Sequence, residues 1–441
     1  MRFIFFLLYI LTSLATFANT TQQFTLSNGL KILVKEDRRA PIAVVMIWYQ
    51  VGSADDPSGK TGISHVLEHL MFKGTKAYPM GVFSKTIASI GGQENAFTST
   101  DYTAYFEKIA ATHVPLALKL EADRMQHLVL DATEFSKEMK VIQEERRMRT
   151  EDNPQALTFE RFLAAAHLTT PYHQPVIGWM NDLKNLSIDD VRDWYRRHYA
   201  PNHATLIVIG DVRAKEIQAY AQQYFGHLEK RPTAKFKPQH EPPALGQKTV
   251  EVHTRAQVPF LLRGYTVPSV KSTSTENALA PYTLEVIAAL LDAGESSRFQ
   301  QHLVRKKQCA SATGVQYNLY TRYDTQFMLY AAPSQQCTMA QLKVAIQEEI
   351  TRLQKELVQN DELQRVKTQL IAEKTFERDS IFSQAMELGI LESIGLPWKI
   401  SNDYENNIQR VTPEMIKRTA SLYFQAENQT DAHLNPKEIT S

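Results

Sequence analysis

Cysteine is nearly absent from this chain of 441 residues, which contains only Cys309 and Cys337. Two thiols cannot form the disulfide framework that stabilises small secreted domains, although in an oxidising compartment this pair could still form one bridge. Charge of one sign is also missing, because 49 basic residues against 48 acidic ones leave a formal net charge of +1. No global field recruits nucleic acid or anionic lipid, so we predict no nucleic-acid partner.

Long hydrophobic runs are lacking as well. The apolar run at residues 3–14 is shorter than the ~20 residues that cross a bilayer. It follows Arg2 and precedes small residues that end at Ala18, which predicts a secretory signal peptide over residues 1–18, cleaved after Ala18. An uncleaved anchor is the alternative. With cleavage, the mature protein is expected to be periplasmic or secreted and to have no integral membrane span.

The chain is too long for one ordinary hydrophobic core, so we expect two large domains or four smaller modules. Residues 231–247 contain four prolines and almost no apolar periodicity, which is the composition of an extended linker. This segment therefore predicts an N-terminal domain over residues 22–230 and a C-terminal domain over residues 248–441.

Strand and helix patterns occur in both predicted domains. The N-terminal one opens with alternating apolar and polar residues around Asn28-Gly29, which predicts a β-hairpin. Residues 186–202 resemble residues 411–428 in the position of an N-cap and in apolar spacing, which indicates an internal duplication. We therefore predict an α+β fold of two homologous domains, each a mostly antiparallel sheet with helices packed on one face, arranged as a clamshell.

Two histidines lie four residues apart in "TGISHVLEHLMFKGT", residues 61–75, with a glutamate between them. The apolar residues of this stretch recur at the spacing of a core-facing helix, which leaves His65, Glu68 and His69 on an adjoining face. Two imidazoles one turn apart can bind one zinc ion, and the carboxylate between them can accept a proton from water. The alternative is a solvated helix face that carries two unrelated histidines.

The second copy of the predicted duplication lacks the two histidines and the glutamate between them. When Gly74 is aligned with Gly294, the residues opposite the polar cluster are Glu285, Ala288 and Ala289. We therefore expect one metal site per chain.

A catalytic zinc site needs a third protein ligand. Residues 134–154 read as a helix closed by Asn153-Pro154, and Glu138 and Glu145 lie two turns apart on one of its faces. We predict that Glu145 is the third ligand and that Glu138 orients a ligand or water. Glu144 points about 100° away on the same helix and ranks lower.

These motifs, together with "GGQENAFTSTDYTAYF" at residues 91–106, resemble the pitrilysin or insulinase (M16) family of zinc peptidases, near its short bacterial and mitochondrial-processing-type members. The resemblance implies a LuxS/MPP-like fold for each domain. It also implies that His65, His69 and Glu145 bind Zn²⁺, that Glu68 is the catalytic base, and that Glu138 supports catalysis.

The segment after Gly91-Gly92 reads as an exposed strand, which could pair with an extended peptide through its backbone. In relatives this strand binds substrate, which implies a substrate-binding role for Asn95, Ala96 and Phe97. The alternative is an ordinary edge strand protected by polar residues.

The second half departs from the family pattern. Relatives that act alone carry an arginine followed seven residues later by a tyrosine, and both reach the substrate. Here Arg305 fills the first position, but Ala312 stands at the second. Tyr317 would face the opposite side of a strand from Ala312, so we read it as a strand aromatic that packs against the sheet.

The resulting hypothesis is a zinc endopeptidase that cleaves extended peptides or unfolded segments. Because Ala312 replaces the tyrosine, a second hypothesis is a catalytic subunit that works only with a sister chain, in a homodimer or heterodimer. A third is a non-proteolytic subunit for peptide binding or assembly, although such relatives generally lose the metal cluster.

Overall fold

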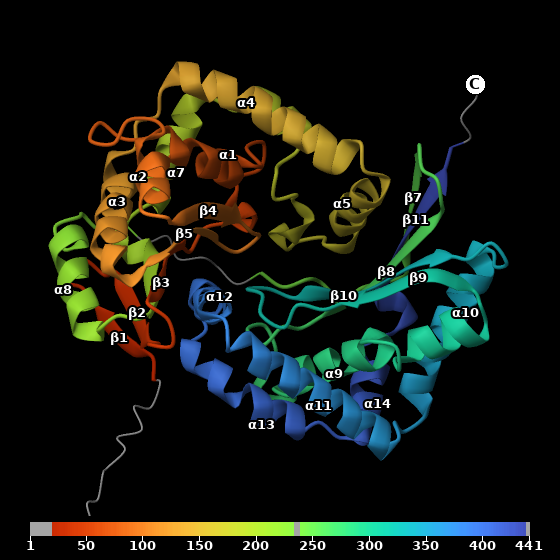
Figure 1. Cartoon of the computed structure of the whole chain (residues 1–441). Helices are drawn as coiled ribbons and strands as arrows, with labels where there is room; N and C mark the ends of the chain where they lie inside the picture. Colours follow the sequence, from red (N-terminus) through yellow and green to blue (C-terminus); the bar gives the residue numbers. More distant parts are fainter. Residues whose placement is uncertain (1–19, 233–238, 438–441) are drawn as a thin grey trace, which may run out of the picture.

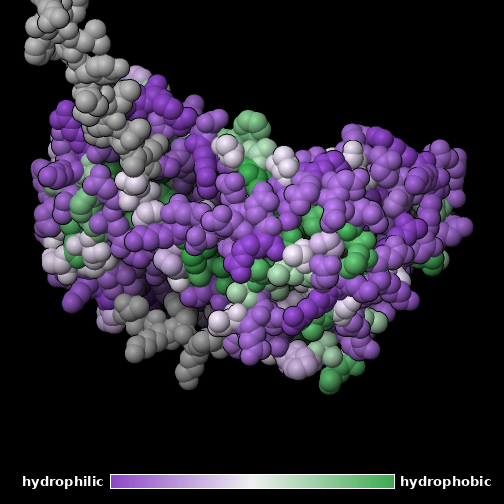
Figure 2. Space-filling view, turned by 90° about the horizontal axis from the view of Figure 1, so that it is seen from below, coloured by the Kyte–Doolittle hydropathy of each residue, from purple (hydrophilic) through white to green (hydrophobic). Residues whose placement is uncertain are grey.

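The computed structural model describes residues 20–232 and 239–437. The predicted signal peptide over residues 1–18 and part of the predicted linker, residues 233–238, lie outside the described residues. No helix in the described ranges is both long and apolar enough to cross a membrane. The face drawn in Figure 2 is largely hydrophilic, with hydrophobic residues gathered in smaller patches.

The first half of the described chain contains a six-stranded sheet in the order β1-β2-β6-β3-β5-β4. Its two central strands β3 and β6 consist almost entirely of buried residues, whereas β4 forms one edge. The strand bounds are β1 Gln22–Thr25, β2 Lys31–Glu36, β3 Ile42–Tyr49, β4 Gln93–Thr98, β5 Thr103–Ala110 and β6 Ala204–Gly210. The helix bounds are α1 Ile63–Leu70, α2 Val82–Ser89, α3 Val114–His127, α4 Ala132–Arg146, α5 Pro154–Ala166, α6 Met180–Asn185, α7 Ile188–His198 and α8 Ala214–Phe225.

The predicted hairpin at Asn28-Gly29 is present. Strands β1 and β2 pair antiparallel around it, and Gly29 adopts φ +92°, a left-handed conformation that favours glycine. The Asn28 side chain donates hydrogen bonds to the carbonyl oxygens of Phe225 and Leu228, at 2.7 and 3.0 Å. The turn therefore also anchors the end of α8 to the sheet.

The second half contains a five-stranded sheet in the order β7-β11-β8-β10-β9. Its strands are β7 Lys248–Thr254, β8 Phe260–Val267, β9 Ala310–Gln316, β10 Thr325–Pro333 and β11 Gln429–Pro436. Its helices are α9 Ala280–Asp292, α10 Met339–Lys355, α11 Asn360–Glu377, α12 Ile381–Ser393, α13 Tyr404–Gln409 and α14 Pro413–Tyr423. In Figure 1 the two halves lie next to each other, with α5 of the first half over the second sheet and α12 of the second half beside the first sheet.

The predicted internal duplication is confirmed by the sheet topology. When the extra strand β1 is set aside, both sheets have the same strand order. In each sheet the strand that comes last in the sequence pairs parallel with the strand that comes first, β6 with β2 and β11 with β7. The other strand pairs are antiparallel. The N-caps of α7 and α14 also correspond. Ser187 accepts a hydrogen bond from the amide of Asp190, and Thr412 accepts one from the amide of Met415.

Helices cover both faces of each sheet, not one face as the sequence pattern suggested, because each half lends a helix to the other. Helix α12 of the second half packs on β3 and β6, where Ala385 and Leu388 join an apolar cluster that includes Met46 and Trp48. In return, α5 of the first half packs on β7, β8 and β11. The central strands are apolar on both faces, as buried strands require.

A glycine of the second half accommodates an aromatic ring of the first half at each of these two contacts. A Cβ added to Gly389 of α12 would lie 2.0 Å from Cε2 of Trp48. A Cβ added to Gly264 of β8 would lie 2.4 Å from Cζ of Phe162 in α5. Both contacts are therefore too close for any larger residue, and they set how the two halves pack together.

Cys309 and Cys337 form a disulfide with a Cα–Cα distance of 4.9 Å. The bridge joins the residue before β9 to the turn before α10. The pairing that the sequence left open is therefore present.

Substitution of Gly389 by alanine tests the Trp48 contact. In an exposed helix this change would stabilise the protein by about 1 kcal/mol, but here the new methyl group overlaps the Trp48 ring. We expect a net loss of about 1–3 kcal/mol in the free energy of unfolding, measured by chemical denaturation. Gly246→Ala is the matched control, because a Cβ there meets no atom within 4 Å. Equal stability of the two variants would contradict the packing described.

The disulfide closes a loop with a sequence separation of 28 residues. Simultaneous replacement of Cys309 and Cys337 by serine should lower the free energy of unfolding by about 3 to 4 kcal/mol, because the unfolded chain regains the entropy of an open loop. Thermal melts of oxidised and reduced wild type, beside the double variant, check this. Reduced wild type should melt near the variant, and a melt unaffected by reduction would refute the stabilising role.

Candidate metal centre

The helix that carries the two histidines begins at a rigid turn. Gly62, at φ +85°, precedes α1, and its amide donates a 2.7 Å hydrogen bond to the carboxylate of Asp56. Asp56 also accepts a 2.7 Å bond from the hydroxyl of Ser64. The predicted core-facing residues are all buried: Ile63, Val66, Leu67, Leu70 and Met71. The predicted amphipathic helix is therefore confirmed, and its buried face fixes its rotation.

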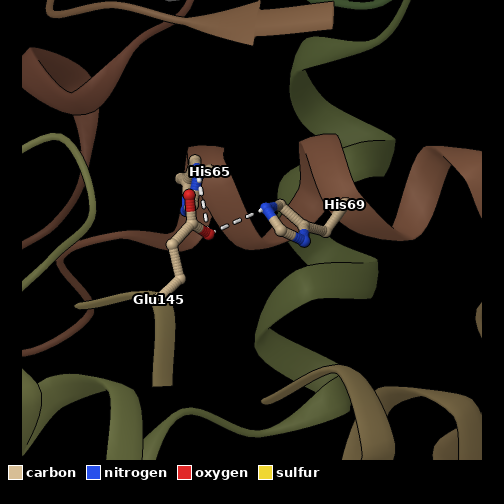
Figure 3. A group of neighbouring side chains, drawn as sticks. All are labelled: His65, His69 and Glu145. Atoms are coloured by element: carbon tan, nitrogen blue, oxygen red, sulfur yellow. Dashed lines mark ion pairs between the residues drawn. The ribbon is translucent and has the colours of Figure 1, made fainter. Parts of the chain in front are cut away.

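Three side chains converge between α1 and α4. His65 and His69 project from α1 toward Glu145 in the last turn of α4 (Figure 3). Nε2 of His69 lies 3.3 Å from Oε2 of Glu145, and Nε2 of His65 lies 3.8 Å from the same oxygen. One candidate ligand atom from each residue falls within 4.8 Å of the others. The structure thus brings together the three residues that the sequence predicted as metal ligands.

The chemistry of this group fits a zinc ion. Oε2 of Glu145 is buried and has no hydrogen-bond partner, although it faces both imidazoles. Burial, with smaller contributions from His69 and Arg149, lowers the pKa of His65 to about 3, so this imidazole is neutral at physiological pH. Imidazole nitrogens from His65 and His69 and one carboxylate oxygen from Glu145 form a donor set typical of catalytic zinc sites, which leave a further position open.

Glu138 contacts His69 from the side away from the cluster. Its Oε1 lies 2.8 Å from Nδ1 of His69, and its Oε2 lies 2.5 Å from Nζ of Lys73. Burial raises the pKa of Glu138, but the hydrogen bonds from Lys73 and His69 outweigh this effect and lower the pKa overall. An ionised carboxylate only accepts hydrogen bonds, so Nδ1 of His69 is the donor and Nε2 presents its lone pair to the cluster.

Glu68 lies on the same helix but in a different environment. Its Oε2 accepts a 2.5 Å hydrogen bond from the hydroxyl of Thr98 on β4. Burial raises the pKa of Glu68, and the Thr98 bond offsets only part of this effect. Thr98 was not among the site residues predicted from the sequence. Alternation along a strand places Ala96 and Thr98 on one face, but only the packing of β4 beside α1 shows that this face meets Glu68.

A cavity of about 1450 Å³ opens beside the three side chains. Asn95, Ala96 and Phe97 line it, as the edge-strand prediction requires. Apolar side chains from α4, α5 and the segment between α5 and α6 form much of the remaining wall, namely Val141, Phe159, Leu163, Val176 and Ile177. The cavity can therefore accept apolar groups next to β4.

The structure does not bring every candidate to this cavity. Arg305 is outside its lining, and its half-exposed guanidinium pairs with Glu295. Glu144 borders the cavity but pairs with Arg147 at 2.7 Å and does not join the cluster. Tyr317 donates a 2.6 Å hydrogen bond to the carbonyl of Pro268 and packs against the core, in agreement with its reading as a strand aromatic.

The corresponding helix of the second half, α9, carries Glu285, whose pKa burial raises to about 7. Within residues 20–232 and 239–437, His65, His69 and Glu145 form the one group of three or more His, Cys, Asp and Glu side chains close enough to hold a metal ion.

Comparison with known proteins agrees with this geometry. A family model described as insulinase (peptidase family M16) matches residues 31–178, and one described as the peptidase M16 inactive domain matches residues 185–370. Over 317 residues the chain is 33% identical to the zinc protease PqqE of Helicobacter pylori, covering 70% of this chain and 69% of that protein. The chain belongs to the M16 (insulinase) family of peptidases.

Solved structures of the M16 family share the fold over nearly the whole chain. The crystal structure of a protease from Helicobacter pylori superposes with a TM-score of 0.87 at 29% identity, covering 95% of this chain and 100% of that one. The first half of the periplasmic protease PqqL from Escherichia coli gives a TM-score of 0.78 at 18% identity, over 94% of this chain and 91% of that one, which indicates a common fold. The two-domain α+β arrangement predicted from the sequence is confirmed.

Replacement of Glu138 by glutamine tests its contact with His69. Glutamine keeps the shape of the side chain but removes the charge that holds the proton on Nδ1, so zinc affinity should fall by about tenfold or more. Chelator competition measures the zinc dissociation constant. Glu134→Gln, on the first turn of the same helix, changes a carboxylate that pairs with Lys137 and not with a histidine, so it should bind zinc as the wild type does. Unchanged affinity in Glu138→Gln would show that Glu138 does not support the site.

Proposed function

We propose that this M16 chain is a zinc endopeptidase that hydrolyses extended peptides or unfolded protein segments. The observation that carries the proposal is the convergence of His65, His69 and Glu145 next to the half-buried Glu68, at the wall of a cavity bordered by an edge strand. The M16 membership and the zinc protease PqqE relative support the same reaction class.

In this proposal His65, His69 and Glu145 hold the zinc ion. Zinc bound there supplies Lewis acidity, which polarises the scissile carbonyl and makes the attacking water more acidic. Glu68 accepts the proton of that water and later delivers it to the leaving nitrogen. Burial raises the pKa of Glu68 toward the range in which a carboxylate both accepts and returns a proton near neutral pH. The Thr98 hydroxyl holds the carboxylate in place.

The substrate is proposed to lie along β4. This strand pairs with β5 on one side only, so its other edge can offer backbone groups to an extended peptide. Asn95, Ala96 and Phe97 border the cavity at this edge. Backbone pairing gives affinity with little sequence selectivity, which suits unfolded segments and excludes most folded proteins.

A second candidate is a catalytic subunit that requires a sister M16 chain. One observation favours it: within the described ranges, the residues that line the cavity all fall between His65 and Ile177, so no described residue of the second half lines it. Arg305 lies elsewhere, and Ala312 on β9 offers no hydroxyl. In this reading a homodimer or heterodimer partner supplies the missing groups. A non-proteolytic subunit is disfavoured, because the predicted ligands and base all converge.

We also propose that the mature protein is periplasmic or secreted. The predicted signal peptide over residues 1–18, the Cys309–Cys337 disulfide and the likeness to the periplasmic protease PqqL of Escherichia coli support this location.

The decisive experiment compares wild type with Glu68→Gln in zinc content and in cleavage of a quenched unstructured peptide. The variant should keep its zinc but lose activity by about 10²–10⁴-fold, because its side chain cannot accept the proton. Glu144→Gln is the matched control, since it makes the same chemical change on an exposed residue at the cavity rim, and it should stay within about twofold of wild type.

Each outcome separates the candidates. Zinc with Glu68-dependent cleavage supports a self-sufficient peptidase. Zinc without cleavage by the wild type alone supports the subunit that needs a sister chain. Absence of zinc from the wild type in metal-replete buffer would refute both catalytic readings.

A further inference from the structure

The residue that follows Glu145 is a buried arginine. Arg146 is 3% exposed, and its two terminal nitrogens donate hydrogen bonds of 2.8 and 3.1 Å to the two carboxylate oxygens of Glu160 on α5. Glu160 is itself buried, at 7% exposure. A two-pronged pair of this kind fixes orientation as well as distance. The end of α4 is therefore fastened to α5 at the position next to the third candidate ligand.

Helix α5 rests in turn on the second half. Phe162 and Ala166 pack against Leu262, Met328 and Ala432 of the five-stranded sheet. The Phe162 ring occupies the space above Gly264, as described for the contact between the halves. In Figure 1, α5 lies over the second sheet while α4 extends back to α1.

A charged group of the second half also holds the end of α5. Nζ of Lys248, on β7, donates to the carbonyl oxygens of Ala165 and Ala166 at 3.0 and 3.3 Å. These carbonyls belong to the last turn of the helix, where intrahelical partners are missing and a cation is favourable. Side-chain packing and a helix cap thus both fix α5 to the second sheet.

We propose that the second half of the chain positions the third metal ligand, and that Arg146 and Glu160 are the positioning residues that transmit this support to Glu145. The two histidines do not need it, because α1 is held by Asp56 and by the core of the first half. Glu145 does need it. It lies one residue before α4 changes to the π-helix Arg147–Glu151, so the regular hydrogen-bond ladder of the α-helix is interrupted there and tertiary contacts fix the local geometry.

This proposal rests on the proposed zinc site, and it gives a role to the second half, of which no described residue lines the cavity. Loss of the α5 contact should loosen Glu145 relative to His65 and His69. Zinc affinity should therefore respond to changes at the α5 contact and not to equivalent changes at the other contact between the halves.

Two glycine substitutions form a matched test. Gly264→Ala pushes on Phe162 and hence on α5, whereas Gly389→Ala pushes on Trp48 and α12, whose apolar cluster contains none of the three ligands. The zinc dissociation constant is measured by competition with a chromophoric chelator, and the melting temperature is measured in parallel. We expect Gly264→Ala to weaken zinc binding at least tenfold and Gly389→Ala to stay within twofold of wild type, although both lower the melting temperature.

A third variant, Glu160→Gln, removes the charge of the pair without forcing α5 to move, and it decides the question if Gly264→Ala does not fold. It should also weaken zinc binding. The absorption spectrum of the Co²⁺-substituted protein should change, because the geometry of Glu145 around the ion is altered. A contact that contributed only to stability would leave this spectrum as in wild type.

The outcomes distinguish this proposal from the one on which it rests. Suppose that wild type binds zinc and that both Gly264→Ala and Glu160→Gln bind it within twofold of wild type. The positioning role is then overturned, and the zinc site stands. If Gly264→Ala does not fold, the same result for Glu160→Gln alone overturns the positioning role. Equal weakening in Gly389→Ala and Gly264→Ala would also overturn it, because general destabilisation would then explain both. If wild type itself binds no zinc, both proposals fail.

Discussion

Both sheets of this protein are apolar on two faces, and each half leaves one of those faces for a helix of the other half to cover. Helix α12 closes the first sheet and α5 closes the second. Burial of this apolar surface is the main favourable contribution to such an interface. It joins the halves at two separate places, so the path from the second sheet through α5 to α4 is continuous packed structure. The position of the candidate metal centre depends on that path.

Three glutamates around the centre differ because their neighbours differ. Hydrogen bonds from Lys73 and His69 lower the pKa of Glu138, which makes it a fixed anionic acceptor. Burial raises the pKa of Glu68, which suits proton transfer. Glu145 keeps a buried oxygen without a hydrogen-bond partner between two imidazoles, which suits a metal ligand. Two neighbouring helices, α1 and α4, thus create three chemical environments around one centre.

Local features of the fold were readable in the sequence. The apolar spacing around His65 predicts α1, because burial of one helical face follows directly from a 3.6-residue period. Asn28-Gly29 predicts its hairpin, because the turn requires a residue that tolerates positive φ. The capped helices that begin after Ser187 and Thr412 reveal the duplication through the same local chemistry. The composition of residues 231–247 is that of a linker, and the domain bounds drawn from it remain a prediction.

Contacts between distant segments were not readable in this way. Thr98 meets Glu68 because β4 passes beside α1, and neither residue signals the other along the chain. Helix period alone placed Glu145 and Glu138 on one face, but the distance from Glu145 to the histidines follows from the packing of α4 on α1. The packing of α5 and α12 on the sheet of the opposite half also depends on tertiary structure. So does the position of Arg305 outside the lining of the cavity.

The sequence by itself determined the identity of the polar groups, the helix that presents the two histidines, and the repeat of one domain plan, because these depend on residue type and on local periodicity. Only the tertiary structure decided which carboxylate oxygen faces the imidazoles, which hydroxyl holds Glu68, and which half supports the end of α4. These outcomes depend on the burial of apolar faces between segments far apart in the chain, and such burial is set by the whole packed structure.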